Sequence, residues 1–167
     1  MKDRLIFISL FILFLIEGMF IQVLTKDTYS SSFSIFPRLV LVLLIYLAIY
    51  YKKNYALFIG IFFGILYDLI FGRVFGIYTI SFISVVYFVV WVVRFYHPSF
   101  LVYLIIQSIT IIFFEVFIYG VLRIFQLAQM PFGEMFIYIL LPTLTFNLLF
   151  AIVFYPLFIK FIGRENV

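Results

Sequence analysis

The chain has no cysteine and a single histidine, His97, among its 167 residues. The missing thiols exclude disulfide bonds, thiolate nucleophiles and cysteine metal sites. His97 precedes Pro98 in a predicted loop, and no cluster of carboxylates lies nearby in the sequence, so we expect no metal and no cofactor. The sequence signatures of serine hydrolases, zinc peptidases and P-loop enzymes are also missing. We therefore expect that the protein is not an enzyme.

Charged residues are scarce, at 11% of the chain, whereas apolar residues make up 68% and the mean hydropathy is +1.32. Soluble domains are close to half apolar, and so short a chain has no interior large enough for the excess. The composition therefore predicts a protein embedded in a lipid bilayer. Its 11 basic side chains stand singly or in one pair between apolar runs. This scatter argues against binding of a nucleic-acid backbone.

About 20 mainly apolar residues cross the hydrocarbon core of a membrane as a helix. Six segments fit this pattern, of which the second and third are short: Leu5–Leu24, Ile35–Tyr51, Tyr55–Phe71, Gly76–Val93, Leu101–Leu122 and Phe136–Phe161. None shows the apolar–polar alternation of barrel strands. We predict an all-α, polytopic membrane protein with about six transmembrane helices, in which residues 1–167 form a single integral membrane domain.

The positions of basic residues predict the orientation, because cytoplasmic loops carry more of them. If the N-terminus is inside, seven basic residues lie on the cytoplasmic side: Lys2, Arg4, Lys52, Lys53, Arg94, Lys160 and Arg164. Four lie outside: Lys26, Arg38, Arg73 and Arg123. We therefore expect both termini in the cytoplasm. Arg38 follows Pro37 after the polar loop 25–34, and we interpret it as an anchor at the membrane interface.

Small residues recur every four positions through the third segment and beyond it: Gly60, Gly64, Asp68, Gly72 and Gly76. The first three share one helix face, and the last two belong to the turn that follows. In lipid, such a face allows another backbone to approach closely. It could pack against helices of this chain or against a partner's helix, and we take Gly64 as a candidate contact. For Asp68 we favour a structural role in the turn, with Arg73 as a candidate partner, over contact with another protein.

Three polar side chains lie deeper in the predicted membrane segments, namely Glu17, Glu115 and Asn147. A polar group in lipid must find a hydrogen-bond partner inside the protein. Glu115 could pair with Arg123 or with Asn147, and the spacing does not decide between them. We favour hydrogen bonding between helices over a ligand site.

Several of these features together resemble a known family. Pro37-Arg38 opens the second segment, Gly60-x3-Gly64-x3-Asp68 follows, and Phe71-Gly72-x3-Gly76-Ile-Tyr78 completes the pattern. Over residues 1–80 this resembles the MreD family of rod shape-determining proteins, and the remainder agrees in length and hydropathy. The resemblance implies a six-helix protein of the bacterial inner membrane with a non-enzymatic role in the cell-wall elongation complex.

The resemblance also implies partners. The direct one is an MreC-type single-pass membrane protein, which links it to a RodA glycosyltransferase, a class B penicillin-binding transpeptidase and MreB filaments. The alternative is the substrate-binding S-component of an energy-coupling-factor vitamin transporter, because the MreD family is similar to those proteins in architecture. Such a component needs polar side chains around an outer vitamin pocket, and this chain has few there: Asp68, Arg73, Arg123 and Glu134.

Overall fold

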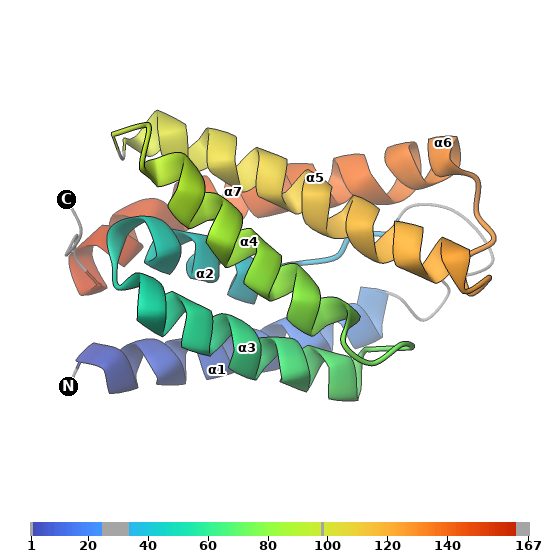
Figure 1. Ribbon diagram of the computed structural model, residues 1–167, viewed down its shortest axis with the longest axis horizontal. Coiled ribbons are helices and arrows are strands. Elements are labelled where there is room, and N and C mark those ends of the chain that lie inside the picture. Colours follow the sequence, from blue (N-terminus) through green and yellow to red (C-terminus); the bar gives the residue numbers. More distant parts are fainter. Residues whose placement is uncertain (1, 25–33, 98, 163–167) are drawn as a thin grey trace.

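A computed structural model describes residues 2–24, 34–97 and 99–162 (Figure 1). The elements are α1 (Lys2–Leu24), α2 (Leu39–Tyr50), α3 (Lys53–Ile70), α4 (Ile77–Val93), α5 (Phe100–Ile124), α6 (Phe132–Met135), the π-helical turn η1 (Phe136–Leu140) and α7 (Leu141–Phe161). This part of the chain contains no strand, and the predicted all-α class is confirmed. The polar loop 25–33 with its Lys26, and also Pro98 and Arg164, lie outside the described residues.

Each of the six predicted segments corresponds to one helical stretch. Four of these are long and apolar enough to cross a membrane: Lys2–Ile21, Lys53–Ile70, Phe100–Ile124 and Phe132–Phe161. The last combines α6, η1 and α7, and it begins one turn earlier than predicted. α2 and α4 are shorter apolar helices. The start of α1, the α2–α3 turn and the end of α7 lie at the same end of the bundle (Figure 1).

α2 is the central helix of the bundle. Each of its 12 residues is buried, and it contacts α1, α3, α4, α5 and α7. A helix of this length spans about 18 Å, which is less than the hydrocarbon thickness of about 30 Å. Residues 34–38, which are not helical, lead into it. Because they lie inside the bundle, their backbone groups need partners from the neighbouring helices.

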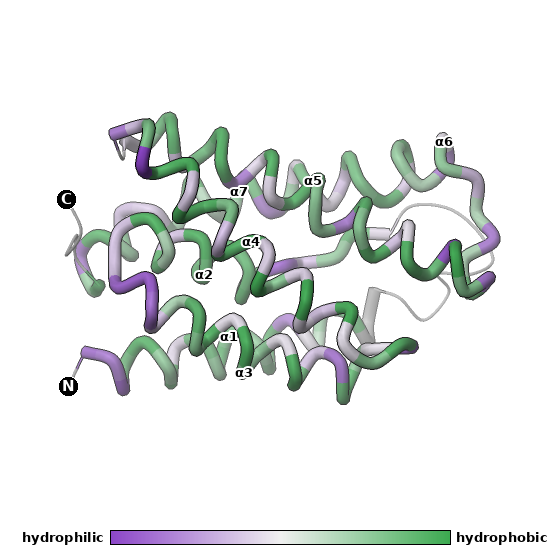
Figure 2. The backbone as a smooth tube through the Cα atoms, in the orientation of Figure 1, coloured by the Kyte–Doolittle hydropathy of each residue, from purple (hydrophilic) through white to green (hydrophobic). Residues whose placement is uncertain are grey.

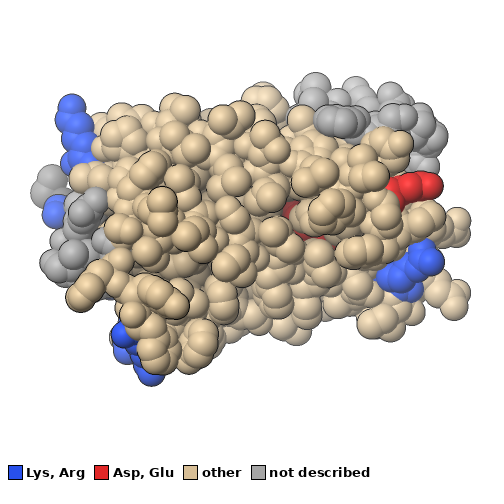
Figure 3. Space-filling view, turned by 90° about the horizontal axis from the view of Figure 1, so that it is seen from above, with Lys and Arg blue, Asp and Glu red and all other residues tan. Residues whose placement is uncertain are grey.

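The outer surface is apolar around the middle of the bundle and charged at the two ends. Figure 2 shows apolar residues along all of the long helices, and Figure 3 shows most lysine, arginine and acidic side chains at the extremities of the elongated molecule. Large apolar side chains such as Ile8 on α1 and Ile105 on α5 are about half exposed, at 53% and 50%. This distribution suits a protein whose middle faces lipid.

Candidate functional site

Arg38, the residue before α2, lies in the protein interior with only 4% of its surface exposed. Its Nε donates a hydrogen bond of 2.7 Å to Oε1 of Glu115 on α5. Its Nη1 lies 4.0 Å from Oε1 of Glu17 on α1. The guanidinium carbon also lies 5.2 Å from the ring centre of Phe114, within the range of a cation–π contact. The interpretation of Arg38 as an interface anchor is therefore wrong: two buried carboxylates hold its charge inside the bundle.

The start of α2 is capped by side chains from distant parts of the chain. A helix leaves its first N–H groups without partners, and inside a membrane protein water cannot supply them. The N–H of Val40 donates to Oε2 of Glu17 at 3.3 Å, and the N–H of Arg38 donates to Oδ1 of Asn147 at 2.7 Å. The carboxylate of Glu17 also suits the positive end of the helix dipole. Glu17 thus lies beside the charge of Arg38 and also caps the start of α2.

Asn147 and Thr143 on α7 hold the non-helical residues that precede α2. Nδ2 of Asn147 donates to the carbonyl of Phe36 at 3.0 Å and to the carbonyl of Thr143 at 2.7 Å. In return, the N–H of Phe36 donates to Oγ1 of Thr143 at 3.1 Å. The N–H of Ser34 donates to the carbonyl of Tyr138 in η1 at 2.9 Å. Residues 34–38 are therefore fixed to α7 and η1 by their backbone.

We call Glu17, Arg38, Glu115 and Asn147 the Arg38 cluster. It contains the three deep polar residues that the sequence analysis identified, namely Glu17, Glu115 and Asn147. All three contact Arg38, which the sequence analysis placed at the membrane interface. Glu115 pairs with Arg38. Arg123, one of its two predicted candidates, instead donates through Nη1 to the carbonyls at the end of the α5–α6 loop. Two acidic residues at membrane depth favour a nearby buried cation, because buried charges are usually paired. This pattern in the sequence could have identified Arg38.

Gly60 and Gly64 lie where α3 packs against α4. A Cβ atom added to Gly64 would lie 2.6 Å from Cα of Thr79, and one added to Gly60 would lie 3.5 Å from Cγ2 of Val86. The first distance is too short for any side chain, so glycine permits the two backbones to approach. The small-residue face therefore packs within this chain, and no room remains at Gly64 for a partner's helix.

Asp68 joins the end of α3 to the start of α4. Its Oδ1 accepts a hydrogen bond from the N–H of Tyr78 at 2.9 Å. Its Oδ2 accepts from the N–H of Thr79 at 3.0 Å and from its hydroxyl at 2.5 Å. Gly76 precedes α4 with φ +97°, a left-handed conformation that favours glycine, and a Cβ on Gly72 would overlap the carbonyl of Asp68. Asp68, Gly72 and Gly76 thus build the turn.

A second polar region lies on the buried face of α5, towards the start of that helix. We call Tyr103, Gln107 and Thr110 the polar seam: they follow one another at helical spacing and are fully buried. Within the described part of the chain, the hydroxyls of Tyr103 and Thr110 and both amide atoms of Gln107 have no hydrogen-bond partner. The ring centre of Tyr103 lies 5.3 Å from that of Tyr155 on α7. Nothing in the sequence ranks these residues above other polar positions.

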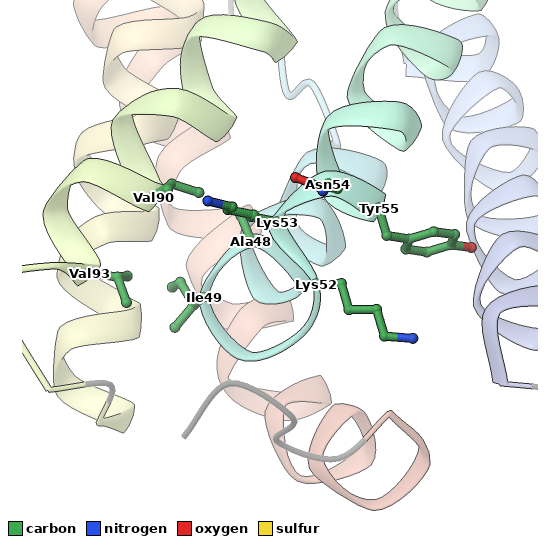
Figure 4. Close-up of a pocket in the computed structure, with 8 residues that line it drawn as sticks. All are labelled: Ala48, Ile49, Lys52, Lys53, Asn54, Tyr55, Val90 and Val93. Atoms are coloured by element: carbon green, nitrogen blue, oxygen red, sulfur yellow. The ribbon is translucent and has the colours of Figure 1, made fainter.

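The described residues hold no group of three or more histidine or acidic side chains that could bind a metal. Two adjoining depressions, of about 460 and 480 Å³, lie beside the α2–α3 turn. Figure 4 shows the first of them, between the α2–α3 turn and the end of α4. The α3–α4 turn, with Asp68 and Arg73, lies at the opposite end of the bundle (Figure 1). The depressions are therefore not at the end where a vitamin pocket was expected.

Comparison with known proteins agrees with this architecture. The model of the rod shape-determining protein MreD family matches residues 2–164, which is nearly the whole chain. No curated protein and no solved structure matches it. The match includes the α3–α4 turn, the residues that lead into α2 and every member of the Arg38 cluster. The chain therefore belongs to the MreD family of rod shape-determining proteins.

Proposed function

We propose that the protein is a non-enzymatic scaffold of the bacterial cell-wall elongation complex, held in the cytoplasmic membrane by its helices. The observation that carries this proposal is the family match over nearly the whole chain, since the family is defined by rod shape determination. The interior agrees with such a role, because its charged groups are enclosed. Glu17 and Arg38 have 0% and 4% of their surface exposed, so neither is placed to meet a substrate.

Both termini are proposed to lie in the cytoplasm. Once Arg38 is recognised as buried, it no longer belongs to the outer set of basic residues. The comparison then changes from seven against four to seven against three, which strengthens the bias. The start of α1, the Lys52–Lys53 turn and the end of α7 share one end of the bundle, as this orientation requires (Figure 1).

The proposed direct partner is the membrane helix of an MreC-type single-pass protein, through which RodA glycosyltransferase, a class B penicillin-binding transpeptidase and MreB filaments are reached. α1 is the candidate surface for this helix. Only 22% of its membrane window is buried inside the protein, compared with 39% for α3 and 44% for α5. Its exposed residues include Ile8, Ile12 and Leu15. In lipid, one apolar helix packs on another mainly through shape.

Affinity purification of a tagged copy from native membranes, with mass spectrometry of the companions, tests the proposal. Recovery of an MreC-type protein, with or without RodA-type synthases, supports it. Recovery of two ATPases and a transmembrane coupling subunit would instead support the vitamin-uptake alternative. An Ile8→Trp/Ile12→Trp variant should lose the MreC-type companion because it changes the shape of the α1 face. Ile105→Trp/Ile109→Trp is the matched control, since both residues are similarly exposed on α5.

A further inference from the structure

The two depressions beside the α2–α3 turn form one groove between α3 and α4. They share Lys53, Asn54 and Val90 in their lining. Figure 4 shows Lys53 extending from the start of α3 towards Val90 on α4, whereas Lys52 points away. The second depression continues towards the middle of the bundle, to Leu57 and Val86. We call this combined depression the α3–α4 groove.

The α3–α4 groove is cationic at its outer end and apolar at its inner end. Lys53 and Arg94 line the outer end, both are exposed, and no acidic residue lines either depression. In the part of the chain that the structure describes, neither cation has an ion pair or a hydrogen bond. Further in, the lining becomes Leu57, about one helical turn after Lys53, and Val86, about two turns before Arg94. The groove thus changes from charge to hydrocarbon along its length.

The lining of the groove suits the depth at which a bilayer changes from headgroups to acyl chains. Trp91 lines it two residues before the end of α4, and tryptophan is enriched at membrane interfaces. Its inner lining comes from α3, a helix long and apolar enough to span the membrane, and from α4 beside it. A soluble anion needs only the outer end. A lipid uses both ends, because its phosphate and its chain are joined.

We propose that the α3–α4 groove binds an anionic phospholipid, with the headgroup phosphate between Lys53 and Arg94 and one acyl chain against Leu57 and Val86. Basic pockets between transmembrane helices on the cytoplasmic side recognise such headgroups. The amide of Asn54, which lines both depressions, is available as a further donor. The site is independent of the scaffold function and requires only that this end of the bundle faces the leaflet that holds anionic lipid.

The first test measures which lipid the purified protein retains. Protein is exchanged into nanodiscs that contain phosphatidylglycerol and phosphatidylcholine in equal amounts, and native mass spectrometry counts the lipids that remain bound after release. The wild type should retain phosphatidylglycerol in preference. Lys53→Gln/Arg94→Gln should weaken this retention by about fivefold for each cation, or about 25-fold together. Arg4→Gln/Lys160→Gln removes two exposed cations outside the groove and should retain lipid as the wild type does.

The second test separates a lipid site from a site for a free phosphate. Val90→Trp fills the groove but keeps both cations, and it should also lose phosphatidylglycerol. Ile80→Trp on the same helix, at a lipid-facing position, is its control. Inorganic phosphate added at millimolar concentration should not displace the lipid. Wild-type retention by Lys53→Gln/Arg94→Gln or by Val90→Trp, an equal loss in the Arg4→Gln/Lys160→Gln control, or full displacement by inorganic phosphate would each overturn the proposal.

Discussion

The Arg38 cluster and the polar seam are both buried beside α2, but they differ in how their polar groups are satisfied. In the Arg38 cluster, Glu115 lies 2.7 Å from the guanidinium, and Asn147 bonds to the backbone before α2. In the polar seam, Gln107 and Thr110 have no hydrogen-bond partner in the described part of the chain. A buried ion without a partner costs far more than a buried amide or hydroxyl. Pairing is therefore more complete in the Arg38 cluster, where Oε1 of Glu17 has no hydrogen bond but lies 4.0 Å from Nη1 of Arg38, than in the polar seam.

Removing Arg38, the buried cation, should cause the largest loss of stability. Arg38→Met leaves Glu17 and Glu115 facing each other in a buried site without a counter-charge. Breaking a buried ion pair from one side typically costs about 3–5 kcal/mol of folding free energy. We expect a loss of that size, measured by unfolding the protein in mixed micelles with increasing sodium dodecyl sulfate. Arg73→Met, at an exposed cation of the α3–α4 turn, is the matched control.

A rescue variant shows whether charge imbalance is the cause. Arg38→Met combined with Glu17→Gln and Glu115→Gln removes all three charges together, and such replacements are often close to neutral. The triple variant should be more stable than Arg38→Met alone. If the two are equally unstable, the shape of the arginine rather than its charge holds the cluster together.

The neutral member of the cluster should have an intermediate effect. Asn147→Ala removes the acceptor for the N–H of Arg38 and the donor to the carbonyl of Phe36. Leaving such buried backbone groups unpaired costs about 1–3 kcal/mol. The same detergent titration measures the loss. Thr145→Ala serves as the control, because its hydroxyl bonds only to the backbone of its own helix at an exposed position. An unchanged midpoint for Asn147→Ala would mean that water replaces these bonds.

Asp68 is a buried carboxylate of a different kind, because it accepts hydrogen bonds from the start of α4 and does not pair with a cation of the Arg38 cluster. Asp68→Leu removes every acceptor for the first turn of α4, which should cost about 1–2 kcal/mol as a lost helix cap does. Asp68→Asn keeps one oxygen acceptor and should be better tolerated. Detergent unfolding of both variants measures the difference. An equal loss from both would show that the negative charge itself is required.

The polar seam should respond least, and in the opposite direction. Gln107→Leu removes two buried polar atoms that have no partner, and Thr110→Val removes a hydroxyl from an almost unchanged shape. Either substitution should leave stability unchanged or raise it by up to about 1 kcal/mol. The readout is again the midpoint of detergent unfolding. A loss above 1 kcal/mol would show that the seam binds water in the folded protein.

The sequence predicted the helices better than their depth in the bundle. Runs of apolar residues define helices of about the right length, and a four-residue spacing identified the face on which Gly60 and Gly64 pack. Nothing in the spacing states which helix lies at the centre. α2 is the shortest of the apolar helices that cross the bundle, and its uniformly apolar sequence fits enclosure on all sides.

Most residues of the Arg38 cluster could be identified from the sequence, but the hydrogen bonds and ion pairs between them could not. Glu17, Glu115 and Asn147 were conspicuous because polar residues are rare in apolar runs. Arg38 was not, since an arginine after a polar loop is usual at a membrane interface. The bonds that join them connect residues 77 and 109 positions apart. Pairing at such separations follows from the packing of whole helices and is not encoded in local spacing.

These sequence separations also affect the order in which the bonds can form during synthesis. The N–H of Arg38 has no Asn147 acceptor until the ribosome has added another 109 residues. At about 5–20 residues per second a ribosome needs about 5–20 s to cover that distance. During this interval only Glu17, of the four members of the cluster, precedes the arginine in the growing chain. The hydrogen bonds that hold the start of α2 can therefore be complete only after α7 has been synthesised, so the C-terminal part of the chain finishes the packing of the N-terminal part.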